Sequence, residues 1–512
     1  MLVQDFLQNS AARRPDKIAL VYEDQRLTYS QLDAKTNRLA NALIKQGVQR
    51  GDRIAIYLHN SVEAVVAIFA ALKSGGVFVL INRSTKTDKL HFILDNCRAS
   101  ALFADPRFLE ETPSAQLLAT VPSLHTVVVC GSSSDQEAAL PAPYHPFAPF
   151  LGQASALPPP KVNIDLDLAC LIYTSGTTGE PKGVMSDHSN VEFAASSIIQ
   201  YLRNVDTDVV INVLPLSFDY GLYQLLMTFK FEGRLVLESG FAYPAAILTR
   251  IEQEQVTGFP GVPTLFAMIL QLDLTPFNLS SLRYITNTAA SLPPSHIQEL
   301  RRKFPQSILY SMYGLTETKR TLYLPPELLD SKPGSVGIAI PGTEVWLEDQ
   351  EGRRLGPDTP GELVVRGRHV MRGYWESPDA TAARFKPGPL PAERVCHTGD
   401  LFRMDTDGCM YFVGRSDDMI KSRGEKVSPK EIENVLYSLE GVLEAAVIGV
   451  PDALLGQAIK AFVVVTDKAL GVAQISAHCR IHLEDFMMPK YIEFRDSLPK
   501  TSSGKISKKG LT

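Results

Sequence analysis

The sequence predicts an α/β protein in which a large N-terminal domain of βα-layered sheets precedes a small α+β C-terminal domain. Helical and strand patterns alternate over residues 1–130 and 168–320, which is typical of mostly parallel sheets covered by helices. Residues 334–412 form short apolar runs between Gly and Pro turns, and there we expect a β-barrel-like subdomain. Charge density rises after Gly414, and roughly 100 residues suffice for a small domain. The domains expected are 1–413 and 414–512.

The first half of the N-terminal domain carries clear helix and strand signals. Leucines at 32, 39 and 43 lie on one face of a helix, and the paired glycines at 75–76 end the next helix. Apolar runs that follow a Gly-Asp turn and this Gly-Gly turn predict strands. The elements expected here are helices over 29–46 and 61–74 and strands over 53–58 and 77–81.

A proline-rich segment separates the two halves of this domain. Residues 131–166 contain LPAPYHPFAPF and LPPPK, and so many prolines favour an irregular connection over a packed element. Helix and strand patterns then return and continue into the C-terminal domain. The elements expected after the connection are strands over 168–173, 208–214, 234–238, 307–311, 445–450 and 460–465 and helices over 220–230, 429–439 and 473–484.

Composition favours a folded, soluble protein of the cytoplasm. The chain has 512 residues, of which 45% are hydrophobic and 21% charged, and its net charge is −5. This mild charge gives no reason to expect a nucleic acid or a membrane as partner, and no apolar run reaches the roughly 20 residues of a membrane helix. Six scattered cysteines without a CxxC pair favour free thiols over disulfides or a zinc site. The opening residues, MLVQDFLQNS, are too polar for a signal peptide.

The loop Tyr173–Met185, YTSGTTGEPKGVM, is the strongest candidate for a binding site. Its glycines let the backbone approach a ligand closely, its hydroxyl groups can donate hydrogen bonds, and Lys182 adds a positive charge. Such a loop suits a polyphosphate. It is not a Walker P-loop, because no Gly-Lys-Ser/Thr follows at the required spacing. Taken alone, the loop could also be a flexible surface segment.

Four further motifs follow the loop along the chain. They are Tyr313-Gly-Leu-Thr-Glu317, Thr398-Gly-Asp400, Gly414-Arg-Ser-Asp417 and Lys500-Thr-Ser-Ser-Gly-Lys505. With the loop, they resemble the nucleotide, ribose, hinge and catalytic lysine motifs of the acyl-adenylate-forming (AMP-forming) superfamily, which includes acyl-CoA synthetases, luciferases and peptide-synthetase adenylation domains. Alone, Asp400 could be a turn residue, Glu317 a helix cap and Lys505 a solvated tail residue. The shared order of all five motifs is what makes the resemblance specific.

The resemblance implies that the chain makes an acyl-AMP from ATP and a carboxylic acid, with Mg²⁺ as the metal. Positioning and electrostatics do most of such catalysis. Lys505 would bridge the acyl carboxylate and the α-phosphate, Tyr313 would stack on adenine, and Asp400 would accept both ribose hydroxyls. The expected ATP-binding residues are Thr174, Ser175, Gly176, Thr177, Thr178, Gly179, Lys182, Tyr313, Gly314, Asp400 and Arg415. The expected catalytic residues are Lys505, Thr316, Glu317 and Lys421, with Glu317 as the metal ligand.

The same resemblance implies a mobile C-terminal domain. In the superfamily this domain rotates after adenylation, so that Lys505 leaves the site and another face closes on it to admit a thiol. Asp417 matches the hinge position, and Lys421 and Gly424 match the second face. The alternative for Asp417 is an acidic surface turn.

The stretch LPLSFDYGLYQL at 214–225 aligns with the superfamily's acyl pocket. Amino-acid adenylation domains place an Asp after a Phe there to bind the substrate's α-ammonium, so Asp219 favours an amino acid. A buried carboxylate is costly unless a cation pairs with it, and a substrate ammonium would be that cation. The alternative is that Asp219 caps the following helix. The expected substrate-binding residues are Asp219, Phe218, Tyr220, Tyr223, Ala289 and Ala290.

The whole pattern resembles free-standing amino-acid adenylating enzymes, notably the L-proline-activating ones of pyrrole and alkaloid pathways. We therefore expect activation of a small amino acid, L-proline first, and transfer to the phosphopantetheine thiol of a carrier protein in antibiotic or toxin biosynthesis. Because the sequence stops at Thr512, soon after the lysine motif, we expect that carrier to be a separate protein. The Gly-Leu-Thr-Glu spelling is that of acyl-CoA synthetases, so a ligase with free CoA as acceptor is the alternative. A nucleotide-binding scaffold without activity is a third.

Overall fold

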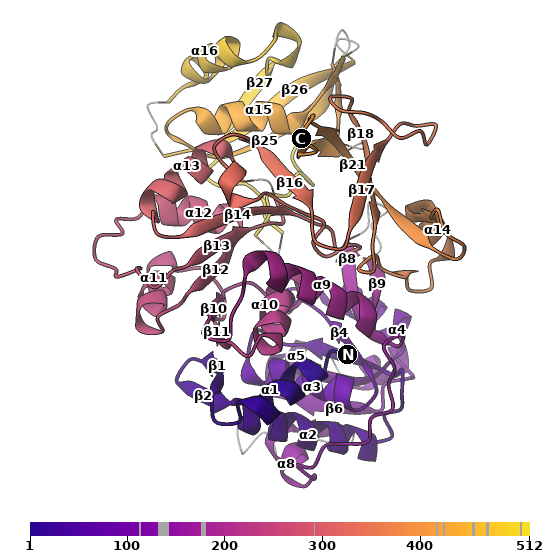
Figure 1. The fold of residues 1–512 in the computed structure, drawn as a ribbon. Helices are drawn as coiled ribbons and strands as arrows, with labels where there is room; N and C mark the ends of the chain where they lie inside the picture. Colours follow the sequence, from indigo (N-terminus) through magenta and orange to yellow (C-terminus); the bar gives the residue numbers. More distant parts are fainter. Residues whose placement is uncertain are drawn as a thin grey trace.

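The computed structural model describes residues 1–111, 114–131, 143–175, 181–290, 292–415, 418–422, 425–452, 456–466, 470–501 and 504–512. Three sheets organise these residues, and helices cover them (Figure 1). The α/β fold, with a large N-terminal and a smaller C-terminal domain, is confirmed. None of the helices in the described part of the chain combines the length and the apolar character that crossing a bilayer requires.

The first sheet has eight strands in the order β19-β9-β8-β4-β3-β5-β6-β7. The strands from β8 to β7 pair in parallel, whereas β9 runs antiparallel to both β8 and β19. Side chains alternate between two cores: Ile54 and Ile56 face the large central core, and Ala55 and Tyr57 face a second core. The bounds are β3 Arg53–Tyr57, β4 Val77–Leu80, β5 Ala99–Ala104, β6 Thr126–Val129, β7 Tyr144–Pro146, β8 Leu168–Ser175, β9 Pro181–Asp187 and β19 Gly373–Tyr374.

The second sheet follows the order β17-β18-β21-β22-β16-β15-β14-β13-β12-β10-β11-β1-β2, with β20 paired to β21. Its half from β14 to β11 is parallel, and its half from β15 to β17 is antiparallel. The β-rich subdomain expected over 334–412 forms this antiparallel half, in an open order that ends at β17. The bounds are β1 Ile18–Tyr22, β2 Gln25–Thr28, β10 Val209–Asn212, β11 Arg234–Leu237, β12 Gly258–Gly261, β13 Tyr284–Asn287, β14 Ile308–Tyr313, β15 Leu322–Tyr323, β16 Ser335–Ala339, β17 Glu344–Glu348, β18 Gly361–Arg366, β20 Phe385–Pro387, β21 Arg394–Met404 and β22 Met410–Arg415.

Helices of the N-terminal domain begin where capping residues and prolines predict them. Thr28 forms a capping box with Gln31 at the start of α2, and Ser61 caps α3. The bounds are α1 Asp5–Arg13, α2 Tyr29–Lys45, α3 Val62–Lys73, α4 Thr87–Asn96, α5 Pro106–Glu111, α6 Ser114–Thr120, α8 Phe147–Gly152, α9 His188–Leu202, α10 Asp219–Lys230, α11 Pro244–Gln253, α12 Pro263–Leu270, α13 Pro294–Lys303 and α14 Pro378–Arg384, with a 3₁₀ turn at Pro326–Leu328.

The C-terminal domain is built on a third sheet with its own core. Strands β24-β23-β26-β25, with β27 beside β26, pack against α15 and α16 around Ile432, Leu436 and Ile475. This domain, yellow in Figure 1, lies beside α13, which contacts α15. The bounds are β23 Ile420–Ser422, β24 Glu425–Val427, α15 Pro429–Ser438, β25 Val442–Asp452, β26 Gly456–Val465, α16 Val472–His482, β27 Tyr491–Phe494 and a 3₁₀ turn at Asp485–Met487.

The expected irregular connection over 131–166 is wrong for its middle. Strand β7 pairs in parallel with β6, and α8 packs against α2. The prolines are compatible with this structure because β7 lies at the edge of its sheet and Pro146 occupies the N-cap of α8, where no N–H is required. Phe147 and Phe150 contact the large core and account for the packing.

All six cysteines are buried thiols, as expected for a chain without disulfides. Burial raises the pKa of Cys97 to about 12 and that of Cys170 to about 11, so these thiols are protonated at neutral pH. They serve packing rather than chemistry.

Candidate active site

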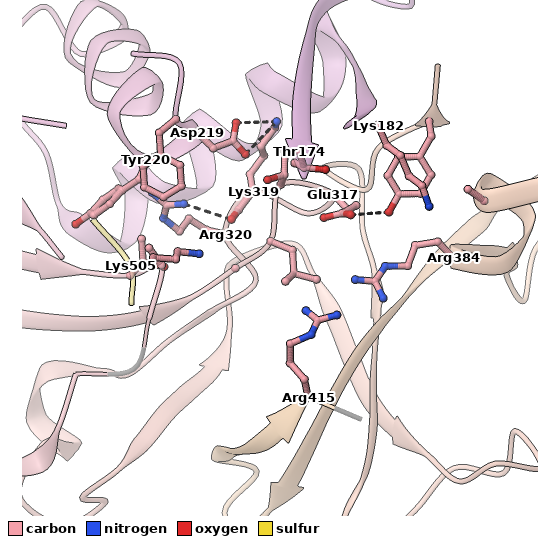
Figure 2. Close-up of a pocket in the computed structure, with 18 of the residues that line it drawn as sticks. Thr174, Lys182, Asp219, Tyr220, Glu317, Lys319, Arg320, Arg384, Arg415 and Lys505 are labelled. Atoms are coloured by element: carbon pink, nitrogen blue, oxygen red, sulfur yellow. Dashed lines mark hydrogen bonds and ion pairs between the residues drawn. The ribbon is translucent and has the colours of Figure 1, made fainter. Parts of the chain in front are cut away.

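A cavity of about 580 Å³ lies where the first two sheets and the C-terminal domain meet (Figure 2). The β8–β9 hairpin, the turn between β14 and β15, the start of α10, helix α14 and the C-terminal turn of Lys505 form its walls. Six cationic and two anionic side chains line the cavity, which gives it an excess of four positive charges. The cations are Lys182, Lys319, Arg320, Arg384, Arg415 and Lys505, and the anions are Asp219 and Glu317. Such an excess is complementary to a polyphosphate.

The β8–β9 hairpin supplies one wall of this cavity. Thr174 pairs with Lys182 across the two strands, so a hydroxyl group and an ammonium group stand side by side at the mouth of the glycine-rich loop. Lys182 Nζ lies 5.7 Å from the centre of the Tyr374 ring. The loop residues Gly176, Thr177, Thr178 and Gly179 and the side chain of Ser175 fall outside the described part, and their roles stay predictions.

The turn between β14 and β15 folds back on itself and turns several side chains into the cavity. Thr321 N–H donates to the Tyr313 carbonyl at 2.9 Å and closes the turn. Gly314 makes this possible, because a Cβ there would overlap the carbonyl oxygen of Lys319. Lys319 itself adopts a φ of +55°, which is uncommon for a side chain of its size. Thr316, Glu317, Lys319 and Arg320 therefore all line the same cavity.

Glu317 stands among hydroxyl groups and cations. Its Oε1 accepts a hydrogen bond from the Tyr374 hydroxyl at 2.6 Å, and Arg384 faces it in Figure 2. In the described residues no three potential ligands gather to hold a metal ion. One carboxylate suits Mg²⁺, because this ion usually keeps water and phosphate oxygens as its other ligands. Glu317 fits a metal carried in with the nucleotide, and Mg²⁺ stays a prediction.

Asp400 lies on β21, and each of its carboxylate oxygens has a partner in the site. Tyr313 Oη donates to Asp400 Oδ2 at 2.6 Å, and Arg415 Nη1 lies 3.3 Å from Oδ1. Burial and the Asp400 charge raise the pKa of the Tyr313 hydroxyl well above its usual value, so it remains a donor. These three side chains line a second cavity of about 330 Å³ beside the first. A carboxylate so held can accept from a diol such as ribose.

Lys505 reaches the first cavity on a tight turn. Thr501 N–H donates to the Lys505 carbonyl at 2.7 Å, and Gly504 in this turn has a φ of +81°. Thr264 on α12 donates to the Gly504 carbonyl at 2.6 Å, which joins the two domains. Burial lowers the pKa of Lys505 to about 8, a shift that Asp400 opposes and Arg320 and Arg415 increase. The domains are thus oriented with the lysine inside the site.

Asp219, the first residue of α10, already has a cation beside it. Lys319 Nζ donates to its two carboxylate oxygens at 2.9 and 3.2 Å. The side chains of Asp219 and Lys319 are only 6% and 1% exposed. The helix-cap alternative is wrong, because the N-cap residue is Phe218 and no side chain caps α10. Lys319 therefore neutralises Asp219 without a substrate ammonium, and substrate binding by Asp219 stays a prediction.

Two family profiles match the chain in the order that the motifs predict. The AMP-binding enzyme family matches residues 7–375, and the AMP-binding enzyme C-terminal domain matches residues 431–505. The chain belongs to the AMP-binding enzyme family. It is an acyl-adenylate-forming, AMP-forming ligase, and the resemblance to that superfamily is confirmed.

Curated relatives of this AMP-binding enzyme include CoA ligases and peptide synthetases. The long-chain-fatty-acid–CoA ligase of Bacillus subtilis (strain 168) is 31% identical over 99% of this chain and 94% of its own length. The feruloyl-CoA synthase of Amycolatopsis sp. is 34% identical over 97% of this chain and 96% of its own. Tyrocidine synthase 3 of Brevibacillus parabrevis is 29% identical over 99% of this chain, which spans only 8% of that protein.

Solved structures resemble the whole AMP-binding enzyme. An anthranilate CoA ligase in complex with anthranoyl-AMP superposes with a TM-score of 0.91 at 29% identity, covering 99% of this chain and 95% of that one. ATP-bound MatB from Rhodopseudomonas palustris superposes with a TM-score of 0.89 at 29% identity, covering 100% and 98%.

The structure gathers most of the predicted site residues around the two cavities. The first cavity is lined by Thr174, Lys182, Phe218, Asp219, Tyr220, Ala289, Gly314, Thr316, Glu317, Arg415 and Lys505. Tyr313, Ala290 and Asp400 line the second. Tyr223 lines neither; it is buried behind Lys319, whose Nζ lies 5.9 Å from its ring centre. Asp417, Gly424 and the side chain of Lys421 lie outside the described residues.

Sequence reasoning missed several residues of the site, among them Lys319, Arg320, Arg384 and Tyr374. Two of these carry a visible signal, because Lys319 and Arg320 follow the Gly-Leu-Thr-Glu motif after a single threonine. Tyr374 comes from β19, which pairs with β9 in the first sheet, and Arg384 comes from α14, which contacts β19; both follow the motif by about 60 residues. No local sequence pattern predicts that Arg384 and Tyr374 belong to the site.

The lowered pKa of Lys505 predicts an alkaline limb in the rate of adenylation. A lysine is charged below its pKa, so kcat/KM for pyrophosphate exchange should be full at pH 7 and fall as the pH rises through about 8. Lys505→Ala should lose adenylation at every pH. Lys505→Arg keeps its charge throughout, so the activity it retains should show no such limb. Lys509→Ala, an exposed lysine in the same tail, is the control. A limb that persists in Lys505→Arg would assign it to another group.

The fold-back turn predicts that Gly314→Ala damages stability and activity together. The new Cβ meets backbone, which cannot move aside, so we expect a loss of about 1–3 kcal/mol in the free energy of unfolding. Displacement of Thr316 and Glu317 should also lower pyrophosphate exchange strongly. Urea unfolding and exchange assays measure the two effects. Gly356→Ala, where a Cβ meets nothing within 4 Å, should change neither. An unaltered Gly314→Ala protein would contradict the turn geometry.

Proposed function

We propose that this enzyme is an acid–CoA ligase that activates a small carboxylic acid with ATP and transfers the acyl group to free CoA. The observation that carries the proposal is the buried Asp219–Lys319 ion pair in the acyl pocket. Because Lys319 already neutralises this carboxylate, a substrate ammonium could pair with Asp219 only by displacing the lysine. The CoA ligases among the relatives, which align over nearly their whole length, support the same acceptor.

In the first half-reaction, a carboxylate oxygen of the acid attacks the α-phosphorus of ATP, and pyrophosphate leaves. Lys182 and Arg384 lie where they can neutralise the leaving pyrophosphate. Lys505 would hold the attacking carboxylate against the α-phosphate, and Thr316 would donate to the phosphate oxygens. Asp400 and Arg415 would hold the ribose, with the adenine in the second cavity beside Tyr313. Mg²⁺ bound at Glu317 would supply further positive charge to the phosphates.

In the second half-reaction, the CoA thiolate attacks the acyl carbon, and AMP leaves. Lys505 occupies the place where a thiol must approach, so the C-terminal domain has to turn before this step. The turn would occur near Asp417, and the face that carries Lys421 would then close on the site. This motion would have to break contacts across the junction, among them the side-chain hydrogen bonds of Thr264 with Gly504 and of Ser295 with Tyr437.

Activation of an amino acid for a carrier protein is the second candidate. The similarity to tyrocidine synthase and the Phe218-Asp219 dipeptide favour it. In that case the substrate ammonium would have to displace Lys319 from Asp219. No contact in the pocket singles out L-proline among amino acids.

The ion pair gives a sharp test between the two candidates. Asp219→Asn or Lys319→Met alone leaves one buried charge unpaired and should cost about 3–5 kcal/mol of stability. The double variant Asp219→Asn/Lys319→Met removes both charges and should regain most of that stability. If the pair is structural, this double variant keeps pyrophosphate exchange with the preferred carboxylic acid. Urea unfolding and an exchange panel over carboxylic and amino acids measure both effects.

The outcomes separate the candidates. Exchange with an amino acid that is lost in Asp219→Asn and stays lost in the double variant would establish ammonium recognition and refute the CoA-ligase proposal. Thioester formation with free CoA, but not with a phosphopantetheine-loaded carrier protein, would support it. Arg301→Met/Asp330→Ala removes an exposed ion pair on the same domain and serves as the matched control.

A further inference from the structure

Arg320 is a buried guanidinium that forms no ion pair with an acid among the described residues, although Asp219 lies close enough for its carboxylate to be influenced by the charge. Arg320 is only 4% exposed and lines the first cavity. It packs its guanidinium over the Tyr220 ring at 4.6 Å from the ring centre. Its one hydrogen bond within the described chain joins Nη1 to the Lys319 carbonyl at 3.3 Å, and its Nε has no partner. A buried charge left in this way is costly unless a ligand completes it.

The charge balance of the pocket's inner wall points to the sign of that ligand. By the inner wall we mean the part of the cavity formed by the start of α10 and by residues 319–320. Its charged side chains are Asp219, Lys319 and Arg320, and the first two neutralise each other. One positive charge remains. The same physical principle that predicts a cation for a lone buried carboxylate predicts an anion here.

A second polar group of this cavity, the Thr288 hydroxyl, also lacks a hydrogen-bond partner within the described residues. The Thr288 hydroxyl is buried, lines the cavity and makes no hydrogen bond in the described chain. The next residue, Ala289, holds a φ of +78° and lines the cavity too. Strained backbone of this kind is commonly kept where a binding loop requires it. A guanidinium and a hydroxyl together form a donor set for a carboxylate.

Lys505 cannot be the group that satisfies Arg320, because both are cations. Figure 2 shows the two side chains entering from different elements on the same side of Tyr220. The carboxylate that reacts is needed at Lys505, between the acid and the α-phosphate. Because the reacting carboxylate and the α-phosphate are assigned to Lys505, we assign to Arg320 a second anionic group on the acid, a short distance from the first.

We propose that Arg320, assisted by the Thr288 hydroxyl, binds a second carboxylate of the acyl substrate, so that the enzyme prefers short dicarboxylic acids. This inference rests on the proposed function, since it names the substrate class of the same site. One carboxylate attacks ATP and becomes the acyl group. The other stays ionised against Arg320 throughout both half-reactions and fixes the orientation of the first.

The test compares acids that differ only in the second carboxylate. Pyrophosphate exchange is measured for malonate and succinate against propionate and butyrate, with wild-type protein and with Arg320→Met, Arg320→Lys and Thr288→Val. We expect wild type to prefer the diacid. Arg320→Met should lower the ratio of kcat/KM for the diacid to kcat/KM for the matching monoacid by about 10- to 100-fold, the loss of one charge-assisted interaction. Arg320→Lys should retain part of the preference, and Thr288→Val should lose a smaller part.

Two controls separate this role from others. AMP binding, measured by calorimetry, should stay within about twofold of wild type in Arg320→Met, because the residue contacts the acid rather than the nucleotide. Equal losses for AMP, monoacid and diacid would overturn the inference in favour of nucleotide binding or folding. Arg301→Met, at an exposed arginine, should change no parameter.

Failure of this inference differs from failure of the proposed function. Exchange and CoA-thioester formation with monoacids but not diacids, in the wild-type protein, would refute the role of Arg320 and leave the CoA ligase in place. Exchange with amino acids alone would refute both. If Arg320→Met fails to fold, the wild-type preference and the Arg320→Lys variant still decide the question.

Discussion

The concentration of positive charge in one partly closed cavity is the constraint on which the rest of this structure depends. Six cations line it, and they come from a hairpin, a turn, a short helix, a strand end and the C-terminal turn. In a site of low dielectric their mutual repulsion is larger than in water. Burial is the main cause of the lowered pKa of Lys505, and repulsion by Arg320 and Arg415 adds to it. An anionic nucleotide relieves this repulsion. Docking of the C-terminal domain, which adds Lys505, is therefore favoured most when ATP and the acid are both present.

The fold-back turn between β14 and β15 carries side chains that we assign to both substrates, ATP and the acid. All four side chains line one cavity. In the function that we propose, Thr316 and Glu317 act on the phosphates, and Lys319 and Arg320 line the acyl pocket. The turn keeps its shape because Gly314 lets the Lys319 carbonyl lie against its Cα. Any shift of this turn moves both sets of side chains together. In the proposed function, nucleotide binding and acid selection therefore both depend on the turn between β14 and β15.

Much of this arrangement can be predicted from the sequence, because the motifs are local. Thr174, Lys182, Thr316, Glu317, Asp400 and Lys505 reach the cavities as their motifs and order imply. The helices and strands that carry them were also predictable, since burial imposes regular spacing. The segment 143–152 was not, because its prolines resemble a loop and its packing depends on an edge strand and on α2, far away in sequence.

Asp219 shows the deeper reason for what sequence reasoning misses. Its surroundings suggest a buried carboxylate in need of a cation, and that deduction is physically sound. The cation, however, comes from Lys319, 100 residues further along the chain. Tyr223 was misplaced for the same reason. Its ring packs against Lys319 instead of lining the cavity. A linear motif does not show which distant residue will neutralise a charged side chain. The net charge of a pocket can therefore be determined only from the folded structure.

The geometry of Lys319 and Arg320 also explains why the same wall cannot serve an amino acid and a diacid equally well. A substrate ammonium that replaced Lys319 at Asp219 would leave the lysine buried next to Arg320, as two neighbouring cations without an anion. That arrangement costs several kcal/mol relative to the existing pair. A second carboxylate at Arg320 leaves the pair intact and neutralises the remaining charge. The proposed preference for acids that carry two negative charges rests on this electrostatic difference.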